Sequence, residues 1–226
     1  MNDRISHRGP DDEGIYINPR HTVGLGHRRL SIIDLTPTGH QPMCNEDQTV
    51  WIVFNGEIYN FQELRPSLEA KGHRFRSHTD TEVILHLWEE YQEDCLQYLR
   101  GMFAFALWDE KRQKLFLARD RLGKKPLKYY IGKNFFVFAS ELKAFIDEPE
   151  VPKEVDLEAI HYFLTQQYVP SPLTGFHQIK KLPPACFLTV NVSGDRPQIR
   201  GPIRYWSLDY SKKLPLSEQE WGERIL

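Results

Sequence analysis

Two oppositely charged residues, Arg29 and Asp80, have the types and positions that could bind a small charged ligand. Arg29 follows an apolar strand, where a guanidinium group is costly unless it meets a carboxylate of the protein or of a ligand. Asp80 stands at a helix start, where a negative charge also simply favours the helix dipole. Together, one fixed cation and one fixed anion could hold a free amino acid by its α-carboxylate and its α-ammonium group.

The dipeptide Asn55-Gly56 has two interpretations. The commonest use of this dipeptide is in a type I′ hairpin turn. Here it closes a buried strand and precedes a helix cap at Asn60, so it could also present a side-chain amide and a glycine N–H to a cleft. Those are the two donor types from which an oxyanion hole is made. The residues alone leave both interpretations open and favour the turn.

The elements that must position these groups follow from hydrophobic periodicity and capping residues. Strands paired as hairpins, with helices before and after, predict an α+β fold with antiparallel sheets rather than a βαβ pattern. Residues 8–14 are rich in Gly and Pro and predict a loop. The predicted strands are 23–34, 49–54 (ending at Asn55-Gly56), 102–108, 115–118, 127–131, 135–139 and 186–192. The predicted helices are 60–72, 79–99, 141–146 and one capped by Asp156, with Ile160, Phe163 and Leu164 as its apolar stripe.

Composition excludes several classes of protein. With 226 residues, 40% of them hydrophobic and 12% aromatic, the chain has enough apolar side chain for a packed core, which excludes disorder. The net charge of -2 predicts no general attraction to nucleic acid or to an anionic membrane. The longest apolar runs are far shorter than the roughly 20 residues of a membrane span, and the N-terminus lacks the apolar stretch of a secretory signal. We therefore expect a cytoplasmic protein with no nucleic-acid or membrane partner.

Metal and triad chemistry are not indicated by any motif. The sequence contains no Walker loop, no HExxH, no GxSxG and no CxxC pair. Cys44, Cys95 and Cys186 are an odd number at wide spacing, which fits neither a disulfide framework nor a zinc site. The nine histidines are scattered, without ligand spacing, so each is interpreted as a surface or core histidine and no metal is expected.

A set of short motifs, taken in order, carries a resemblance to a known family. They are HRGPD at 7–11, HRRLSIID at 27–34, QP at 41–42, NGEIYN at 55–60, TDTE at 79–82, GMFAF at 101–105, ARDRLG at 118–123 and ASELKA at 139–144. This set resembles the amidotransferase domain of glutamine-hydrolysing asparagine synthetases, a class II glutamine amidotransferase of the N-terminal-nucleophile fold. The similarity runs from Ser6 to about Trp206.

The resemblance implies a fold, a substrate and a role for each matching residue. The fold would be a four-layer αββα sandwich, and the substrate would be glutamine, hydrolysed to glutamate and ammonia. Arg29 would hold the α-carboxylate, Asp80 the α-amino group, and Asn55 with Gly56 the oxyanion of the tetrahedral intermediate. The other residues expected at the glutamine site are Leu30, Ser31, Ile32, Ile33 and Glu57.

The resemblance also implies parts that these 226 residues do not carry. The nucleophile of the family is a cysteine at the mature N-terminus, whose α-amine acts as the base, whereas this chain begins with Met1 and Asn2. We expect a domain at 1–206 that lacks its first strand and helix, followed at 207–226 by a linker and the start of a synthetase domain. That further domain would use ATP and Mg²⁺; no cofactor is expected for 1–206, and a homodimer is possible.

Two alternatives remain open at this point. A non-catalytic module, as in the β-lactam synthetases, would need no cysteine. The domain could also belong to another class II amidotransferase, such as glucosamine-6-phosphate synthase or the phosphoribosyl amidotransferase.

Overall fold

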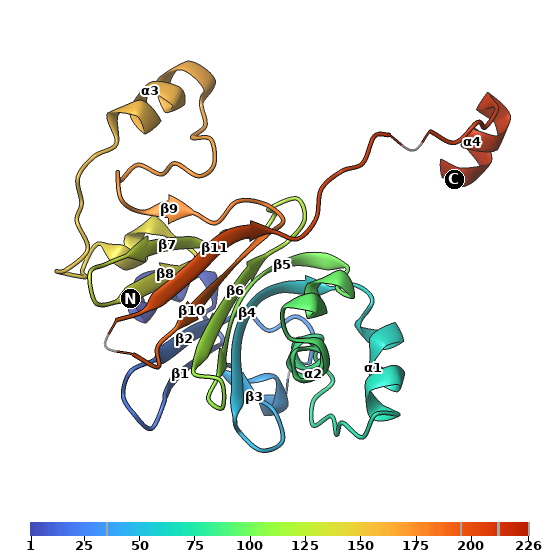
Figure 1. Ribbon diagram of the computed structural model, residues 1–226, viewed down its shortest axis with the longest axis horizontal. Helices are drawn as coiled ribbons and strands as arrows, with labels where there is room; N and C mark the ends of the chain where they lie inside the picture. The colour runs from blue at the N-terminus through green and yellow to red at the C-terminus, as the bar shows by residue number, and fades with distance from the viewer. Residues whose placement is uncertain (35, 195, 212, 226) are drawn as a thin grey trace.

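A six-stranded antiparallel sheet organises the computed structural model, which describes residues 1–34, 36–194, 196–211 and 213–225 (Figure 1). Its strand order is β11-β10-β6-β5-β4-β3. The strands are β3 (Met43–Cys44), β4 (Val50–Ile58), β5 (Gly101–Asp109), β6 (Lys114–Arg119), β10 (Cys186–Asn191) and β11 (Gln198–Arg204). The hairpin predicted from 102–108 and 115–118 is confirmed as β5 and β6.

Two smaller antiparallel sheets lie against this sheet. One pairs β1 (Asp12–Ile17) with β2 (Gly24–Arg29). The other has the order β8-β7-β9 and consists of β7 (Lys128–Ile131), β8 (Phe136–Ala139) and β9 (Lys180–Lys181). The predicted hairpin at 127–131 and 135–139 is thereby confirmed.

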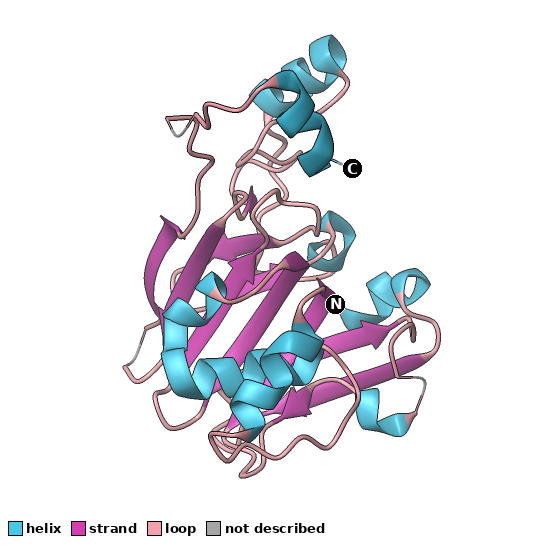
Figure 2. Ribbon diagram, turned by 90° about the vertical axis from the view of Figure 1, so that its right-hand side faces the viewer, coloured by secondary structure: helices cyan, strands magenta, loops and turns pink. Residues whose placement is uncertain are grey.

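Three apolar clusters separate the layers. Helices α1 (Phe61–Glu69) and α2 (Thr81–Tyr91) cover one face of the large sheet, and Trp88 of α2 is fully buried there (Figure 2). On the opposite face, β4 and β5 pack against β2 and β7, which contributes Tyr129. The next side chain of β7, Tyr130, points the other way and packs against two 3₁₀ helices, η1 (Asn2–Arg8) and η4 (Leu142–Phe145). The α+β class is confirmed, with helical elements on both outer faces of the sheets.

The predicted end of the central strand is wrong. Strand β4 does not stop at Asn55-Gly56 but pairs with β5 as far as Ile58 opposite Gly101. Gly56 permits this pairing because a Cβ atom there would lie 2.2 Å from the carbonyl oxygen of Met102. The type I′ turn interpretation of the dipeptide is therefore excluded, and both residues lie inside the sheet.

The sequence predicted where the helices begin more accurately than how long they are or how deeply they are buried. The helix start at 79–82 is confirmed, but α2 ends at Tyr91, where Gln92 adopts a φ of 51° and a 3₁₀ helix, η3 (Gln92–Gln97), follows. The expected loop at 8–14 is partly wrong, because its last residues pair in β1. The helix predicted at 141–146 is the 3₁₀ helix η4.

Helix α3 (Leu157–Gln166) has the predicted cap but not a buried stripe. Asp156 accepts a hydrogen bond from the N–H of Ala159 at 3.0 Å. Ile160, Phe163 and Leu164 are nevertheless 40%, 53% and 75% exposed, and α3 stands apart from the sheets (Figure 1). Amphipathic spacing thus located the helix but not its environment.

The segment after Trp206 leads away from the sheets to helix α4 (Glu218–Ile225) (Figure 1). The predicted linker and helix at 207–226 include Lys212 and Leu226, which lie outside the described residues. Among the residues that are described, no helix is long and apolar enough to cross a membrane.

Candidate functional site

A cavity of 490 Å³ lies between the large sheet and the small sheets. Its walls come from β2, β4, β5 and β8, from η1 and from the start of α2. Of the residues predicted at the glutamine site, Ser31 does not line the cavity; its N–H instead donates to Asp11 at 2.8 Å. The predicted residues that do line it are Arg29, Leu30, Ile32, Ile33, Asn55, Gly56, Glu57 and Asp80.

Arg29 is buried at the end of β2, where its guanidinium meets backbone carbonyl groups rather than a carboxylate. Nη1 donates to the carbonyl oxygen of Thr36 at 3.3 Å, and Nη2 donates to those of Ile33 and Asp34. Among the described residues, no acceptor is bound to Nε–H or to the second Nη1–H. Arg29 therefore holds the backbone of Ile33, Asp34 and Thr36 and keeps donors for an anionic ligand.

Asp80 is buried at the N-cap position of α2, yet its side chain does not cap the helix. Oδ2 instead accepts the N–H of Ile58 from β4 at 2.7 Å. Burial raises the pKa of Asp80 to about 6, and the nearby Glu57 carboxylate adds to the rise. The attraction of a cation bound in the cavity would offset the cost of burying this carboxylate, so the site favours a ligand with a positive group beside Asp80.

Asn55 offers a donor that the protein does not use. Its Nδ2 is buried and has no hydrogen-bond partner among the described residues. Since a buried donor without an acceptor costs about 1–3 kcal/mol, such a group is expected where a ligand supplies the acceptor. Asn55 lines the cavity, so its amide is a candidate donor to an oxygen atom of a bound ligand.

The Gly56 N–H lies on the same edge of β4 as two occupied N–H groups. Because N–H groups alternate between the two edges of a strand, those of Phe54, Gly56 and Ile58 point the same way. The Phe54 N–H donates to the Gln41 side chain at 2.7 Å, and the Ile58 N–H donates to Asp80. Gly56 thus presents its N–H between two side chains that line the cavity.

His27 is a cavity residue that the sequence analysis left unassigned. Its Nε2 donates to the carbonyl oxygen of Phe54 at 3.0 Å, and its buried Nδ1 has no partner within the described chain. Burial lowers the pKa of His27 to about 4, so the ring is neutral near pH 7 and Nδ1 is an acceptor. The only signal in the sequence was its place in the HRRLSIID motif.

Two residues of the ARDRLG motif have a structural role. Arg119 donates to the carbonyl oxygens of Gly123, Lys125 and Leu182, at 2.6–2.7 Å. Asp120, buried beside it, accepts backbone N–H groups from the same loop and from β5. Neither residue lines the cavity.

The cysteines lie elsewhere as well. Cys44 is partly buried in β3, and Cys95 and Cys186 are buried in the apolar clusters. None of the three lines the cavity. They are therefore not candidates for a nucleophile in it.

Comparisons with known proteins agree with this site. Residues 1–206 match the family model described as a glutamine amidotransferase domain. The chain is 45% identical over 196 residues to glutamine-hydrolyzing asparagine synthetase 1 of Bacillus subtilis (strain 168), covering 86% of this chain and 30% of that protein. It is 37% identical over 249 residues to putative glutamine-hydrolyzing asparagine synthetase 2 of Methanocaldococcus jannaschii, covering 100% of this chain and 47% of that protein. The chain thus spans less than half the length of these curated relatives.

A solved structure supports the fold. The glutamine phosphoribosylpyrophosphate amidotransferase from B. subtilis, complexed with ADP and GMP, superposes with a TM-score of 0.54 at 21% identity, covering 78% of this chain and 34% of that one. This likeness concerns the fold alone. With the family match over nearly the whole chain, the resemblance found in the sequence is confirmed, and the chain belongs to the family of glutamine amidotransferase domains.

Proposed function

We propose that this chain is the glutamine-binding domain of an asparagine synthetase, in which glutamine is hydrolysed to glutamate and ammonia for the ATP-dependent amidation of aspartate. The observation that carries the proposal is the meeting of Arg29, Asp80 and the unpaired Asn55 amide on one cavity. The relatives named as glutamine-hydrolyzing asparagine synthetases support the proposal that aspartate accepts the ammonia. Aspartate, ATP and Mg²⁺ would be handled by a further domain of a longer chain.

Each end of glutamine has a complementary group in the cavity. The free N–H donors of Arg29 suit the α-carboxylate, and the desolvated carboxylate of Asp80 suits the α-ammonium group. When a nucleophile attacks the side-chain amide, negative charge develops on its oxygen, and the Asn55 amide with the Gly56 N–H would stabilise it. Leu30, Ile32, Ile33 and Glu57 complete the wall.

The nucleophile in this proposal is a cysteine ahead of Met1 in a longer chain. The α-amine of an N-terminal cysteine would take the thiol proton and later return it to the leaving ammonia. This cysteine, the domain division at Trp206, the cytoplasmic location and the possible homodimer all stay predictions.

Glutamine binding tests the proposal without requiring turnover. In calorimetry with residues 1–226, we expect binding of L-glutamine and clearly weaker binding of 4-carbamoylbutanoate, which lacks the α-ammonium group. Asp80→Ala should weaken glutamine binding by about tenfold or more and abolish the preference over the deamino compound, because the ammonium group loses its charged partner. Asp94→Ala, which removes an exposed carboxylate from η3, is the matched control and should change neither affinity.

The same experiment separates the alternatives. A non-catalytic module of the kind discussed above would show no glutamine binding in the cavity. Equal affinity of the parent chain for the two ligands, or a preference that survives Asp80→Ala, would contradict the assigned role of Asp80.

A further inference from the structure

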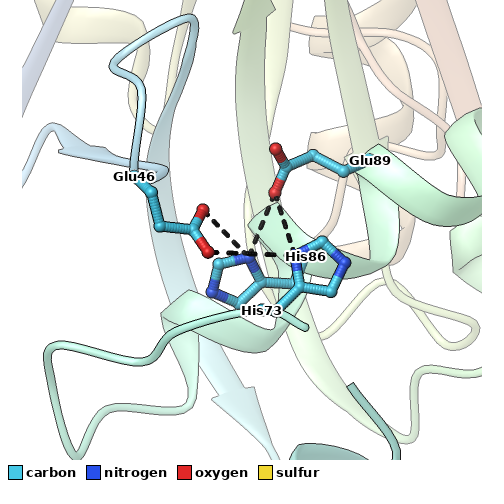
Figure 3. Close-up of side chains that lie close together, drawn as sticks. All are labelled: Glu46, His73, His86 and Glu89. Carbon is cyan, nitrogen blue, oxygen red and sulfur yellow. Dashed lines mark hydrogen bonds and ion pairs between the residues drawn. The ribbon is translucent and has the colours of Figure 1, made fainter. Parts of the chain in front are cut away.

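Two histidines and two glutamates gather on the helical side of the large sheet, away from the cavity. We name Glu46, His73, His86 and Glu89 the His–Glu cluster, and Figure 3 shows their side chains converging. Glu46 lies in the turn between β3 and β4, His73 in the loop after α1, and the other two on α2. One ligand atom from each lies within 4.8 Å of all the others.

The distances inside the cluster suit a shared ion better than hydrogen bonds. His73 Nδ1 lies 3.6 Å from Glu89 Oε2 and 3.9 Å from Glu46 Oε1. His86 Nδ1 lies 3.0 Å from Glu89 Oε2 and 3.7 Å from Glu46 Oε2. Only the 3.0 Å contact is a hydrogen bond by distance. A tetrahedral zinc ion with nitrogen and oxygen ligands at about 2.0–2.2 Å separates its ligand atoms by about 3.3–3.6 Å, close to the distances found.

Outer contacts hold three of the four side chains with their ligand atoms inward. His73 Nε2 lies 3.2 Å from Glu90 Oε1, an arrangement in which a carboxylate fixes the ring of a metal-ligating histidine. Asn45 Nδ2 donates to Glu89 Oε1 at 2.7 Å, which leaves Oε2 for the cluster. The N–H of Arg74 donates to Glu46 Oε1 at 2.8 Å, which leaves Oε2 inside.

The rings of His73 and His86 have centroids 4.6 Å apart, and the Nδ1 atoms of both face the Glu46 and Glu89 carboxylates. A divalent ion suits this arrangement, because it binds imidazole nitrogen and carboxylate oxygen together and neutralises the carboxylates.

We propose that the His–Glu cluster binds one zinc ion, with Nδ1 of both histidines and one oxygen of each glutamate as ligands. His86 is almost fully buried, whereas Glu46 and Glu89 are 29% and 25% exposed, so an ion can enter past the glutamates. Four protein ligands close the coordination sphere, which makes the site structural rather than catalytic. The ion would tie α2, whose N-cap residue is Asp80, to the β3–β4 turn and to the loop after α1.

This proposal departs from the expectation of no metal and does not depend on the proposed function. The ligands come from three separate segments, and only His86 and Glu89 are neighbours on one helix, so no ligand spacing was visible in the sequence.

Zinc titration against a chromophoric chelator tests the site. We expect one zinc per chain with a Kd in the micromolar range or tighter. A roughly hundredfold excess of zinc over Kd should raise Tm by about 5 °C, since an ion that binds only the folded state stabilises it. Cobalt bound in place of zinc should give the strong visible absorption of tetrahedral coordination.

Matched variants locate the ion. His73→Gln and Glu89→Gln should each weaken binding by about 30-fold or more and abolish the cobalt spectrum. Because both side chains are partly exposed, either variant serves if the other fails to fold. His161→Gln, on the exposed face of α3, and Cys44→Ser should bind zinc like the parent chain. Parent-like zinc binding by His73→Gln and Glu89→Gln, loss of binding in Cys44→Ser, or a weak octahedral cobalt spectrum would overturn the proposal.

Discussion

Replacing Asp80 by asparagine should stabilise the fold while removing its charged group from the cavity. The folded state raises the pKa of this carboxyl from 3.8 to about 6, so it favours the neutral form. One pKa unit corresponds to about 1.4 kcal/mol, and ionised Asp80 therefore costs the folded state about 3 kcal/mol well above pH 6. Below pH 3.8 the carboxyl is neutral in both states and the cost vanishes. The asparagine side chain keeps an oxygen for the Ile58 N–H.

The pH dependence provides the decisive measurement. Linkage gives a cost of about 1.6 kcal/mol at pH 5 and about 3 kcal/mol at pH 7.5, so the stability gained by Asp80→Asn should rise by about 1.4 kcal/mol between them. Urea unfolding of both proteins at the two pH values measures this difference, and Asp94→Asn serves as the exposed control. At pH 7.5, Tm should rise by about 4–10 °C. A gain that is the same at both pH values, or a destabilised variant, would refute the assignment of a strained, desolvated carboxylate.

Three further changes test other parts of the structure. Asp120→Ala leaves backbone N–H groups without an acceptor and should lower the free energy of unfolding by about 3 kcal/mol, measured in urea; a loss below about 1 kcal/mol would contradict its anchoring role. The low pKa of His27 means that acidification from pH 7.5 to 4.5 costs the parent about 2.5 kcal/mol, because the unfolded ring takes up a proton first. His27→Gln should lose about 2.5 kcal/mol less unfolding free energy than the parent over this pH range. The same loss in both proteins would argue against a depressed pKa of His27. Gly56→Ala places a Cβ 2.2 Å from the Met102 carbonyl oxygen, so Tm should fall by several degrees, consistent with about 1–3 kcal/mol of overpacking, and an unchanged Tm would show that β4 and β5 can separate.

Local signals in the sequence were reliable where short-range interactions decide the structure. The two hairpins and the start of α3, where Asp156 caps the helix, depend on neighbouring residues, and these predictions are confirmed. Helix α2 also begins where the sequence predicts it, although the Asp80 side chain does not cap it. The strand end predicted at Asn55-Gly56 is wrong because the turn preference of the dipeptide is local, whereas β4 is extended by its pairing with β5, more than 40 residues later. The close approach that Gly56 allows is visible only once both strands are present.

The candidate site also contains some features that the sequence predicts and others that it does not. Charge and position alone suggested that Arg29 and Asp80 act together, and both line the cavity. The carbonyl partners of Arg29 lie only four to seven residues further along the chain, but their contact depends on how that segment turns back after β2, which no motif predicted. His27 donates to Phe54, 27 residues later in β4, and this contact exists only once β2 packs against β4. The same holds for the exposed stripe of α3, since periodicity specifies which side of a helix is apolar but not whether anything covers it.

Two neighbouring side chains hold the loop after β6. Arg119 donates hydrogen bonds to carbonyl groups of the loop, and Asp120 accepts them from its backbone N–H groups. This loop carries the chain from the large sheet to β7 in the small one. A homologue that no longer turned over any substrate would still need both charges to make that crossing. The ARDRLG motif therefore indicates a shared fold. Only the groups that face the cavity can distinguish an active enzyme from an inactive homologue.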